Sequence, residues 1–269
     1  MATKISLKQL SKEVLDLLNR GGGSLEKDIT SNVTVGAAPA NTKFPQGQTF
    51  TEFAEKILRK DITPNLSASF SNTGLHEIGT TVSEVTMTAS IPNENQVTIP
   101  IKSLKFYTGT TLLADKPYIK GSTYSYVYSA PITTNTNFKI ELVYDTNSIV
   151  SKSADITFVY ATYYGVTNQS TINDTVATML TNSFNKQILN KKGFTWNNII
   201  LNDERFCYMY PKSFGTLASI KDGNNFEQLQ SYIRYEVNIT SPINGDVVAY
   251  YAYLLTDSAT GSGFKQTYA

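Results

Sequence analysis

The sequence predicts a mainly β protein that begins with short helices, and three observations support this fold class. The chain of 269 residues contains 17 Tyr and 13 Phe and is rich in Thr, whereas only 17% of its residues are charged. Aromatic and β-branched residues favour the pleated, half-buried surface of a sheet. Apolar residues alternate with a period of two after residue 64, and the clearest helical spacing lies before residue 61. At ~100–200 residues per domain, the length indicates about two domains.

The first element is predicted over residues 5–20, as an amphipathic helix. Its apolar residues are spaced by three, four and three positions, which is the pattern of a coiled-coil seam. Ser6 and Gln9 fit a capping box at its start, and three glycines follow Arg20 at its end. The residues expected to mediate anchoring or oligomerisation are Leu7, Leu10, Val14, Leu17 and Leu18. A lone helix of about four turns is marginal in water, so its apolar stripe either docks on its own chain or binds another protein surface.

Residues 21–63 are predicted to form a linker that includes a second short helix near residues 50–60. Glycines and small polar residues dominate the first part of this segment. Thr49 and Glu52 have the spacing of a capping box, and Pro64 follows the end of the helix. The expected apolar face of this helix consists of Phe50, Phe53, Ala54, Ile57 and Leu58.

Residues 64–160 are predicted to form an immunoglobulin-like β-sandwich. Short runs of alternating apolar and polar residues are separated by turn-rich pieces such as 71–74 and 145–147. Such runs across ~100 residues are typical of this fold. The Cys…Trp…Cys signature of antibody domains is absent, so the prediction rests on the alternation alone. The apolar residues of these runs are Val85, Met87, Ala89, Ile91, Leu104, Phe106, Tyr124, Tyr126, Tyr128, Phe138, Ile140, Leu142, Tyr144, Ala154, Ile156, Phe158 and Tyr160.

Residues 161–269 are predicted to form a second β-rich domain. Two stretches are ambiguous, since 173–189 fits a helix or an irregular strand and 213–220 fits a short helix. The longest apolar run of the chain has nine residues, which we interpret as a buried strand because a membrane-crossing helix needs ~20. We therefore expect no membrane partner. The expected strands are Ile199–Leu201, Phe206–Tyr210, Ile233–Ile239, Val247–Leu255 and Phe264–Tyr268.

Charge and cysteine content argue against several classes of partner and site. The 23 basic and 22 acidic residues give a net charge of +1, which provides no field to attract nucleic acid. The one cysteine, Cys207, excludes an intrachain disulfide and disfavours a Cys-based zinc site. The N-terminus lacks the apolar core of a secretory signal, so we expect synthesis in a reducing cytoplasm.

The residue inventory predicts that the protein is not an enzyme and holds no cofactor or metal. The sole histidine, His76, is expected to be a solvated loop residue, and Cys207 a packed core residue. No nucleophile–base pattern surrounds either of them. Residues 222–225 have the residue types of a calcium loop without its ligand spacing, so we expect a plain turn. A carboxylate pair for glycoside hydrolysis needs no fixed spacing, and nothing singles out two of Glu84, Glu94, Asp115, Glu141, Asp222 and Glu227.

A group of tyrosines in the second β-rich domain has two interpretations. Tyrosine packs across strands in the core of a sheet, and it also offers amphipathic contact area for interfaces and sugars. Core packing is the first interpretation, and a binding surface is the second. The group consists of Tyr208, Tyr210, Tyr232, Tyr235, Tyr250, Tyr251 and Tyr253.

Three stretches of the chain resemble a family of virion structural proteins of tailed bacteriophages. Residues 36–58 are similar to a segment that precedes immunoglobulin-like domains in appendage and tail-associated proteins of these phages. Residues 64–80 and 158–165 are similar to the opening and the exit of such a domain. The third stretch resembles a C-terminal β domain of the same proteins and comprises Tyr208–Gly215, Leu217, Ser219, Ile220 and Phe226.

The resemblance implies a homotrimeric fibre or appendage of the virion, made in the cytoplasm of the host bacterium. Its expected partners are capsid, portal, neck or tail proteins, to which the N-terminal region binds while the β domains project outward. The family supplies no catalytic residues. The alternative function is a carbohydrate- or receptor-binding module for host attachment, with a host surface glycan as the partner.

Overall fold

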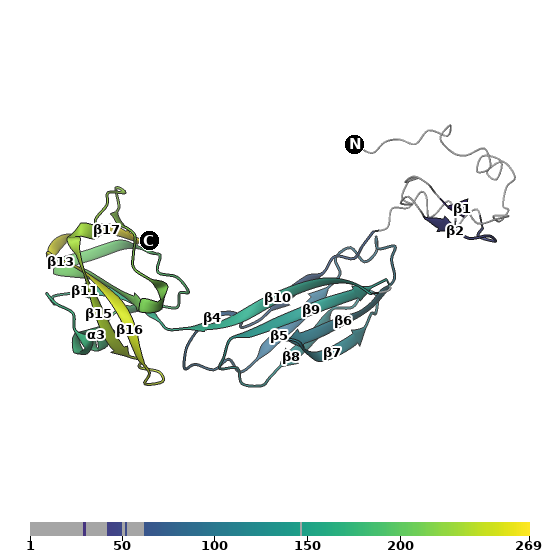
Figure 1. The fold of residues 1–269 in the computed structure, drawn as a ribbon, viewed down its shortest axis with the longest axis horizontal. Helices are drawn as coiled ribbons and strands as arrows, with labels where there is room; N and C mark the ends of the chain where they lie inside the picture. The colour runs from purple at the N-terminus through teal and green to yellow at the C-terminus, as the bar shows by residue number, and fades with distance from the viewer. Residues whose placement is uncertain (1–28, 31–41, 50–51, 53–61, 146) are drawn as a thin grey trace, which may run out of the picture.

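The computed structural model describes residues 29–30, 42–49, 52, 62–145 and 147–269. These residues are mainly β, which confirms the predicted fold class at this level. Figure 1 shows two β units that lie end to end, the first built from β3 to β10 and the second from β11 to β17. We call them the first and the second β unit.

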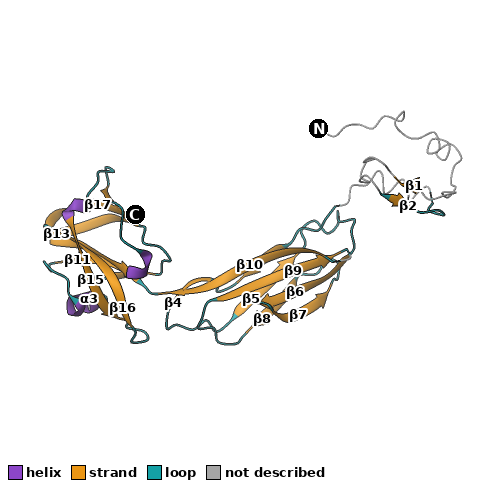
Figure 2. Cartoon of the chain, viewed as in Figure 1, coloured by secondary structure: helices purple, strands orange, loops and turns teal. Residues whose placement is uncertain are grey.

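Strands account for nearly all of the regular structure in both units (Figure 2). The first β unit contains β3 (Ser67–Phe70), β4 (Gly74–Glu77), β5 (Val85–Ser90), β6 (Ile101–Thr108), β7 (Thr111–Pro117), β8 (Tyr124–Tyr128), β9 (Thr136–Tyr144) and β10 (Ser148–Val159). The second contains β11 (Thr162–Thr167), α3 (Asp174–Leu180), β12 (Asn185–Gln187), β13 (Phe194–Pro211), the 3-10 turn η2 (Lys212–Phe214), β14 (Ile220–Asp222), the 3-10 turn η3 (Leu229–Ser231), β15 (Tyr232–Thr240), β16 (Val247–Leu255) and β17 (Ala259–Tyr268).

The described residues before the first β unit form a pair of short strands and a helix cap. β1 (Ile29–Thr30) pairs antiparallel with β2 (Lys43–Phe44) inside the predicted linker. The Thr49 N–H donates to Glu52 Oε2 at 2.9 Å and the Glu52 N–H donates to Thr49 Oγ1 at 3.3 Å, so the predicted capping box is present. The rest of that predicted helix lies outside the described residues. So does the whole first helix, with Leu7, Leu10, Val14, Leu17 and Leu18.

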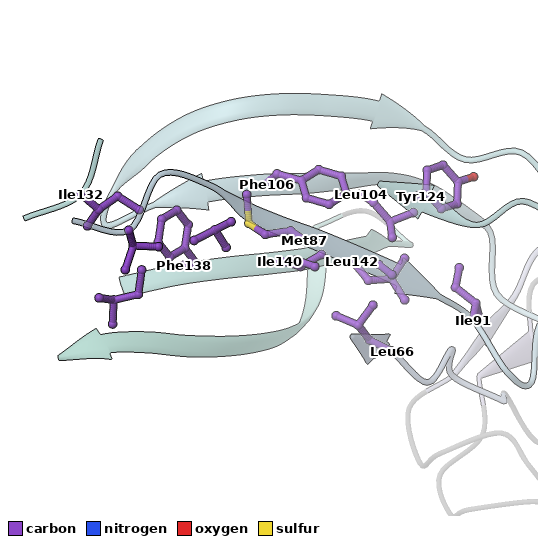
Figure 3. Close-up of a cluster of buried hydrophobic side chains, with 14 of the residues drawn as sticks. Leu66, Met87, Ile91, Leu104, Phe106, Tyr124, Ile132, Phe138, Ile140 and Leu142 are labelled. Carbon is purple, nitrogen blue, oxygen red and sulfur yellow. The ribbon is translucent and has the colours of Figure 1, made fainter. Parts of the chain in front are cut away.

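Two sheets of the first β unit enclose one hydrophobic core. The five-stranded sheet has the order β4-β10-β9-β6-β7, and the three-stranded sheet has the order β3-β5-β8. Met87 of the smaller sheet and Phe106 and Ile140 of the larger one are fully buried in the same cluster (Figure 3). The alternation therefore predicted the inward face of most strands. The predicted apolar residues that are buried are Val85, Met87, Ala89, Ile91, Leu104, Phe106, Tyr124, Phe138, Ile140, Leu142, Ile156 and Phe158.

The chain enters the first β unit at one end and leaves it at the other. Before β3, the Asn65 N–H donates to Asn93 Oδ1 at 2.8 Å, in the loop that follows β5. β3 pairs with β5, and the chain then crosses at residues 71–73 to the other sheet, where β4 runs parallel to the last residues of β10. The final pair, Glu77 with Val159, lies at the end that faces the second β unit (Figure 1).

The second β unit is organised around β13, an 18-residue strand with different partners along its length. Its first half pairs with β17, and its second half lies between β11 and β16. Cys207 and Met209 point into one hydrophobic cluster, whereas Tyr208 and Tyr210 point into another on the opposite face. Because both faces are covered, the central strands are continuous apolar runs without alternation. The predicted buried strand Val247–Leu255 is β16.

The two ambiguous stretches of this unit are resolved by local hydrogen bonding. The Asn173 side chain accepts the Val176 N–H at 2.9 Å and caps α3, whose buried residues are Ala177 and Leu180. α3 also lies along β15, since Asp174 Oδ1 accepts the N–H of Asn238 at 2.9 Å. Residues 173–189 therefore contain a helix and then the short strand β12. Of residues 213–220, which also fitted a short helix, only the start is helical, in the single 3-10 turn η2.

The predicted strands Ile199–Leu201 and Phe206–Tyr210 are parts of one strand. Along residues 196–204 the pairing of β13 with β17 shifts register three times, and Asn198 and Asp203 have positive φ angles of 56°. Irregularities of this kind, such as β-bulges, bend a strand without ending it. The polar residues 202–205, which were not predicted as strand, therefore lie inside β13.

Candidate functional site

His76 and Cys207, the two residues considered for nucleophilic chemistry, both lie in strands and pack against other side chains of the fold. His76 is part of β4 and is half-buried, so its prediction as a solvated loop residue is wrong. Its Nε2 lies 3.0 Å from the Asn72 carbonyl oxygen, and its ring is 5.7 Å from that of Phe158. Cys207 is fully buried, as predicted, and burial raises the pKa of its thiol well above the ordinary value. A protonated, buried thiol has no access to a substrate.

The suspected calcium loop at 222–225 is a plain turn, as predicted. Asp222 Oδ1 accepts two backbone N–H groups of its own turn, each at 2.9 Å. Glu227 Oε1 accepts those of Ile220 at 2.9 Å and Leu229 at 3.0 Å. The bond from Ile220, followed by that from Leu229, lowers the pKa of the Glu227 carboxyl. Both carboxylates therefore fix backbone geometry.

The other four candidate carboxylates have partners within the first β unit. Glu94 Oε2 accepts the Gly121 N–H at 3.0 Å and the Tyr118 hydroxyl at 3.2 Å, which ties two loops together. The remaining contacts are Lys105–Asp115 at 3.7 Å, Lys139–Glu141 at 2.7 Å and the Thr86 hydroxyl with Glu84 at 3.4 Å. Among the six residues considered, the described contacts do not single out a catalytic pair.

The tyrosine group of the second β unit belongs to its core. Six of its seven members are at most 8% exposed, and Tyr235 is half-buried. The outer side of Tyr251 is covered by cations, with Arg234 Cζ at 5.1 Å and Lys212 Nζ at 5.5 Å from the ring centroid. Core packing is therefore the correct interpretation for the group, and these rings offer no surface for stacking on a sugar.

The two β units are joined by a short connection with several specific contacts. Only Tyr160 and Ala161 separate β10 from β11. The Tyr250 hydroxyl of β16 donates to the Ala161 carbonyl oxygen at 2.7 Å, and the Tyr160 hydroxyl donates to Asp246 Oδ2 at 2.7 Å. The connection is thus hydrogen bonded to the second β unit at both residues. We call this region, with the contacts described next, the junction.

An ion pair and a close backbone approach complete the junction. Lys186 Nζ lies 2.7 Å from Glu77 Oε2, and the side chains are 43% and 8% exposed, respectively. Burial, and then the charge of Glu77, raise the pKa of the neighbouring Tyr163 to about 12. A Cβ atom on Gly79 would lie 2.9 Å from side-chain atoms of both Ile243 and Asn244. The turn after β4 therefore packs directly on the β15–β16 loop.

Removal of the two junction charges is expected to have unequal effects. Lys186→Met leaves the nearly buried Glu77 carboxylate without its cation, which should destabilise the chain by about 1–3 kcal/mol. Glu77→Gln leaves an ammonium group that is still partly in water, so we expect a smaller loss, below about 1 kcal/mol. Urea denaturation of both variants and of the double variant measures the coupling. A larger loss in Glu77→Gln than in Lys186→Met would contradict this account of the pair.

No sequence pattern predicted the junction, because Glu77 and Lys186 are 109 positions apart. The predicted anchoring residues Leu7, Leu10, Val14, Leu17 and Leu18 are not among the described residues. In the described part of the chain, no group of three or more His, Cys, Asp or Glu side chains could hold a metal ion. Across the same ranges, no helix is both long and apolar enough to cross a membrane. No family model, no curated protein and no solved structure matches this chain.

Proposed function

We propose that this protein is a structural component of a tailed-bacteriophage virion, a homotrimeric appendage whose N-terminal region binds a capsid, portal, neck or tail protein. The β units then project from the particle. The observation that carries the proposal is the end-to-end arrangement of the two β units across a two-residue connection. Such an arrangement places the second β unit beyond the end of the first β unit that is opposite to its point of entry.

The hydrogen bonds at both ends of the first β unit support a role as a spacer. At the incoming end, Asn93 accepts the Asn65 N–H and donates to the Thr63 carbonyl oxygen at 3.0 Å. At the outgoing end, the Glu77–Lys186 pair and the Tyr160–Asp246 bond join the units. A two-residue connection limits how far the second β unit can move from the first, and these contacts favour one orientation at the junction. We therefore infer that the first β unit acts as a spacer between the N-terminal region and the second β unit.

An immunoglobulin-like fold for the first β unit is part of the proposal. Its two facing sheets, mostly antiparallel and with one shared core of alternate residues, are in keeping with that architecture. The division of the leading strand into β3 and β4, one in each sheet, agrees with it as well. The sequence resemblance of residues 64–80 to the opening of such domains provides a separate line of support.

A non-catalytic role is favoured by how the reactive residue types are used. The carboxylates of Asp222 and Glu227 hold a turn, and Cys207 is enclosed in the core. Self-association is favoured by the apolar seam of residues 5–20, which has the spacing of a coiled coil, and a trimer is what the resemblance to phage appendages implies. Three copies of a weak anchor gain avidity on a symmetric particle.

Deletion of residues 1–20 tests the proposal. We expect the truncated chain to keep the β units folded, since the hydrophobic clusters of both units are built from residues 66–268. Incorporation into particles should be lost, as measured by immunoblotting of purified virions made with the full-length or truncated protein. Light scattering should show a trimer for the full chain and a monomer for the truncation.

A matched variant separates loss of the apolar seam from loss of chain length. Leu10→Asp and Val14→Asp together place charges in the seam while the length is kept, and should also abolish incorporation. Lys8→Asp, outside the seam, should leave it unchanged. Normal incorporation of the truncated chain, or of the double variant, would overturn the proposed anchor.

A further inference from the structure

Three aromatic side chains at the edge of the second β unit keep contact with solvent. Tyr164 of β11 and Phe194 and Trp196 of β13 are half-buried, and the Tyr164 ring lies 4.5 Å from Phe194 and 5.0 Å from Trp196 between centroids. Beneath them, buried Phe206 lies 6.0 Å from Trp196 and buried Tyr208 lies 5.7 Å from Phe194. The inner rings hold the outer ones in place. We call Tyr164, Phe194 and Trp196 the aromatic patch.

Amide side chains lie beside the aromatic patch. Asn185 of β12 is directly opposite Tyr164 in the antiparallel pair, and Gln187 is opposite Thr162, two residues before it. Directly opposed residues point to the same face of a sheet, so both amides lie on the Tyr164 side. Lys186, between them, points to the other face, where it contacts Glu77. Asn185 is exposed and Gln187 is half-buried.

A third amide, that of Gln266, belongs to the packing beside the indole ring. Gln266 of β17 is directly opposite Trp196 and only 6% exposed. Its Oε1 is closed to solvent, so it is not part of the surface that a ligand could contact. The polar groups available beside the aromatic patch are therefore those of Asn185 and Gln187.

We propose that the aromatic patch, with Asn185 and Gln187, binds a neutral saccharide. A pyranose ring has an apolar C–H face that packs on an aromatic ring, and hydroxyl groups that pair with amides. Ligand sites commonly combine apolar walls with a few polar groups of this kind. Both polar side chains are uncharged, which favours a neutral sugar over an anionic one. The proposal rests on the display function above only for the source of the sugar, a host-cell surface.

The position of the sole tryptophan makes the binding directly measurable. Trp196 is the one tryptophan of the chain, so its fluorescence reports on the aromatic patch alone. The probes are methyl α-D-glucopyranoside, methyl β-D-galactopyranoside, N-acetyl-D-glucosamine and L-rhamnose, titrated into the full chain, and a printed glycan array. At least one probe should change the emission in a saturable way, with a Kd on the order of 1 mM for a monosaccharide. Glucuronate, which is anionic, should bind more weakly.

Variants at the border of the patch keep the fluorescent probe and test the site. Asn185→Ala combined with Gln187→Ala should weaken binding about tenfold, because two hydrogen-bonding groups are removed. Asn168→Ala, an exposed amide beyond the end of β11, should bind as the original chain does. Thermal unfolding of each variant checks the fold.

The outcomes separate this inference from the proposed function. No saturable change with any probe and no signal on the array would overturn the saccharide site, and so would unchanged affinity in the double variant. Either result leaves particle incorporation as it was. Conversely, sugar binding in a chain that never enters particles would overturn the virion role and keep the site.

Discussion

Gly165→Ala is expected to destabilise the second β unit by about 3 kcal/mol. Gly165 is buried in β11, where a Cβ atom would lie 2.3 Å from Cδ1 and 2.7 Å from Cε1 of Phe184. Real contacts of this kind are not closer than about 3 Å, so the ring of Phe184 would have to move. Phe184 is 9% exposed and packs in the same cluster as α3, which leaves the ring little room. Urea denaturation followed by Trp196 fluorescence measures the loss.

A second glycine gives the matched control for this prediction. A Cβ atom on Gly193 would meet nothing closer than the Tyr268 carbonyl oxygen, at 3.5 Å, and the φ angle of Gly193 is not positive. Gly193→Ala should therefore change stability by less than about 1 kcal/mol, or stabilise the chain slightly through the unfolded state. Phe184→Leu combined with Gly165→Ala should cost less than the sum of the single changes. Additive losses would show that the ring of Phe184 is not the obstacle.

The sequence predicted which side chains are buried in the first β unit better than in the second, which contains Phe184 and Gly165. The alternation of residues 85–91 and 138–142 predicted which side chains of the first β unit are buried, because each sheet there has one face on the core and one in solvent. The second β unit lacks that pattern, since β13 and β16 are covered on both faces. Their apolar runs still predicted strands, but not which residues pack together.

The strand boundaries that the sequence missed are set by strand pairing. The polar residues 202–205 were not predicted as strand, but they lie inside β13 because its pairing continues on both sides of them. His76 was expected in a loop because its neighbours Gly74 and Gly79 are turn residues, yet the parallel pairing with β10 makes a short strand between them. Such pairing depends on residues about 80 positions away, which no local pattern contains.

The candidate sites could not be predicted from the sequence because they also depend on strand pairing. Tyrosine content left a binding surface as the second interpretation for the second β unit, but six of the seven tyrosines are core residues. The aromatic rings of the proposed patch, Tyr164, Phe194 and Trp196, come from two strands 30 positions apart. Composition can show that a unit is rich in aromatic residues, whereas the pairing of β11 with β13 decides which of them reach the surface.

Phe138→Ala is expected to destabilise the first β unit by about 3–5 kcal/mol while the second keeps its stability. Phe138 is fully buried in β9, and its ring packs against the edge of Tyr128 at 5.3 Å between centroids. The cluster that contains Phe138 draws only on residues 66–158, and the two clusters of the second β unit draw only on residues beyond 158. No hydrophobic cluster of the described residues thus crosses the junction. The cavity left by Phe138→Ala should therefore destabilise the first β unit alone.

Two probes measured on the same sample distinguish the units. Hydrogen exchange of peptides from β5, β6 and β9 reports on the first β unit, and Trp196 fluorescence reports on the second. In Phe138→Ala the exchange protection of the first should fall, whereas the urea midpoint of Trp196 emission should stay within error of the original. Ile149→Ala, at a side chain that is 53% exposed, should change neither by more than about 1 kcal/mol. If the Trp196 midpoint fell together with the exchange protection, the junction contacts at Glu77, Lys186 and Tyr160 would have to couple the units into one cooperative fold. That coupling would be stronger than one ion pair and a few hydrogen bonds normally provide.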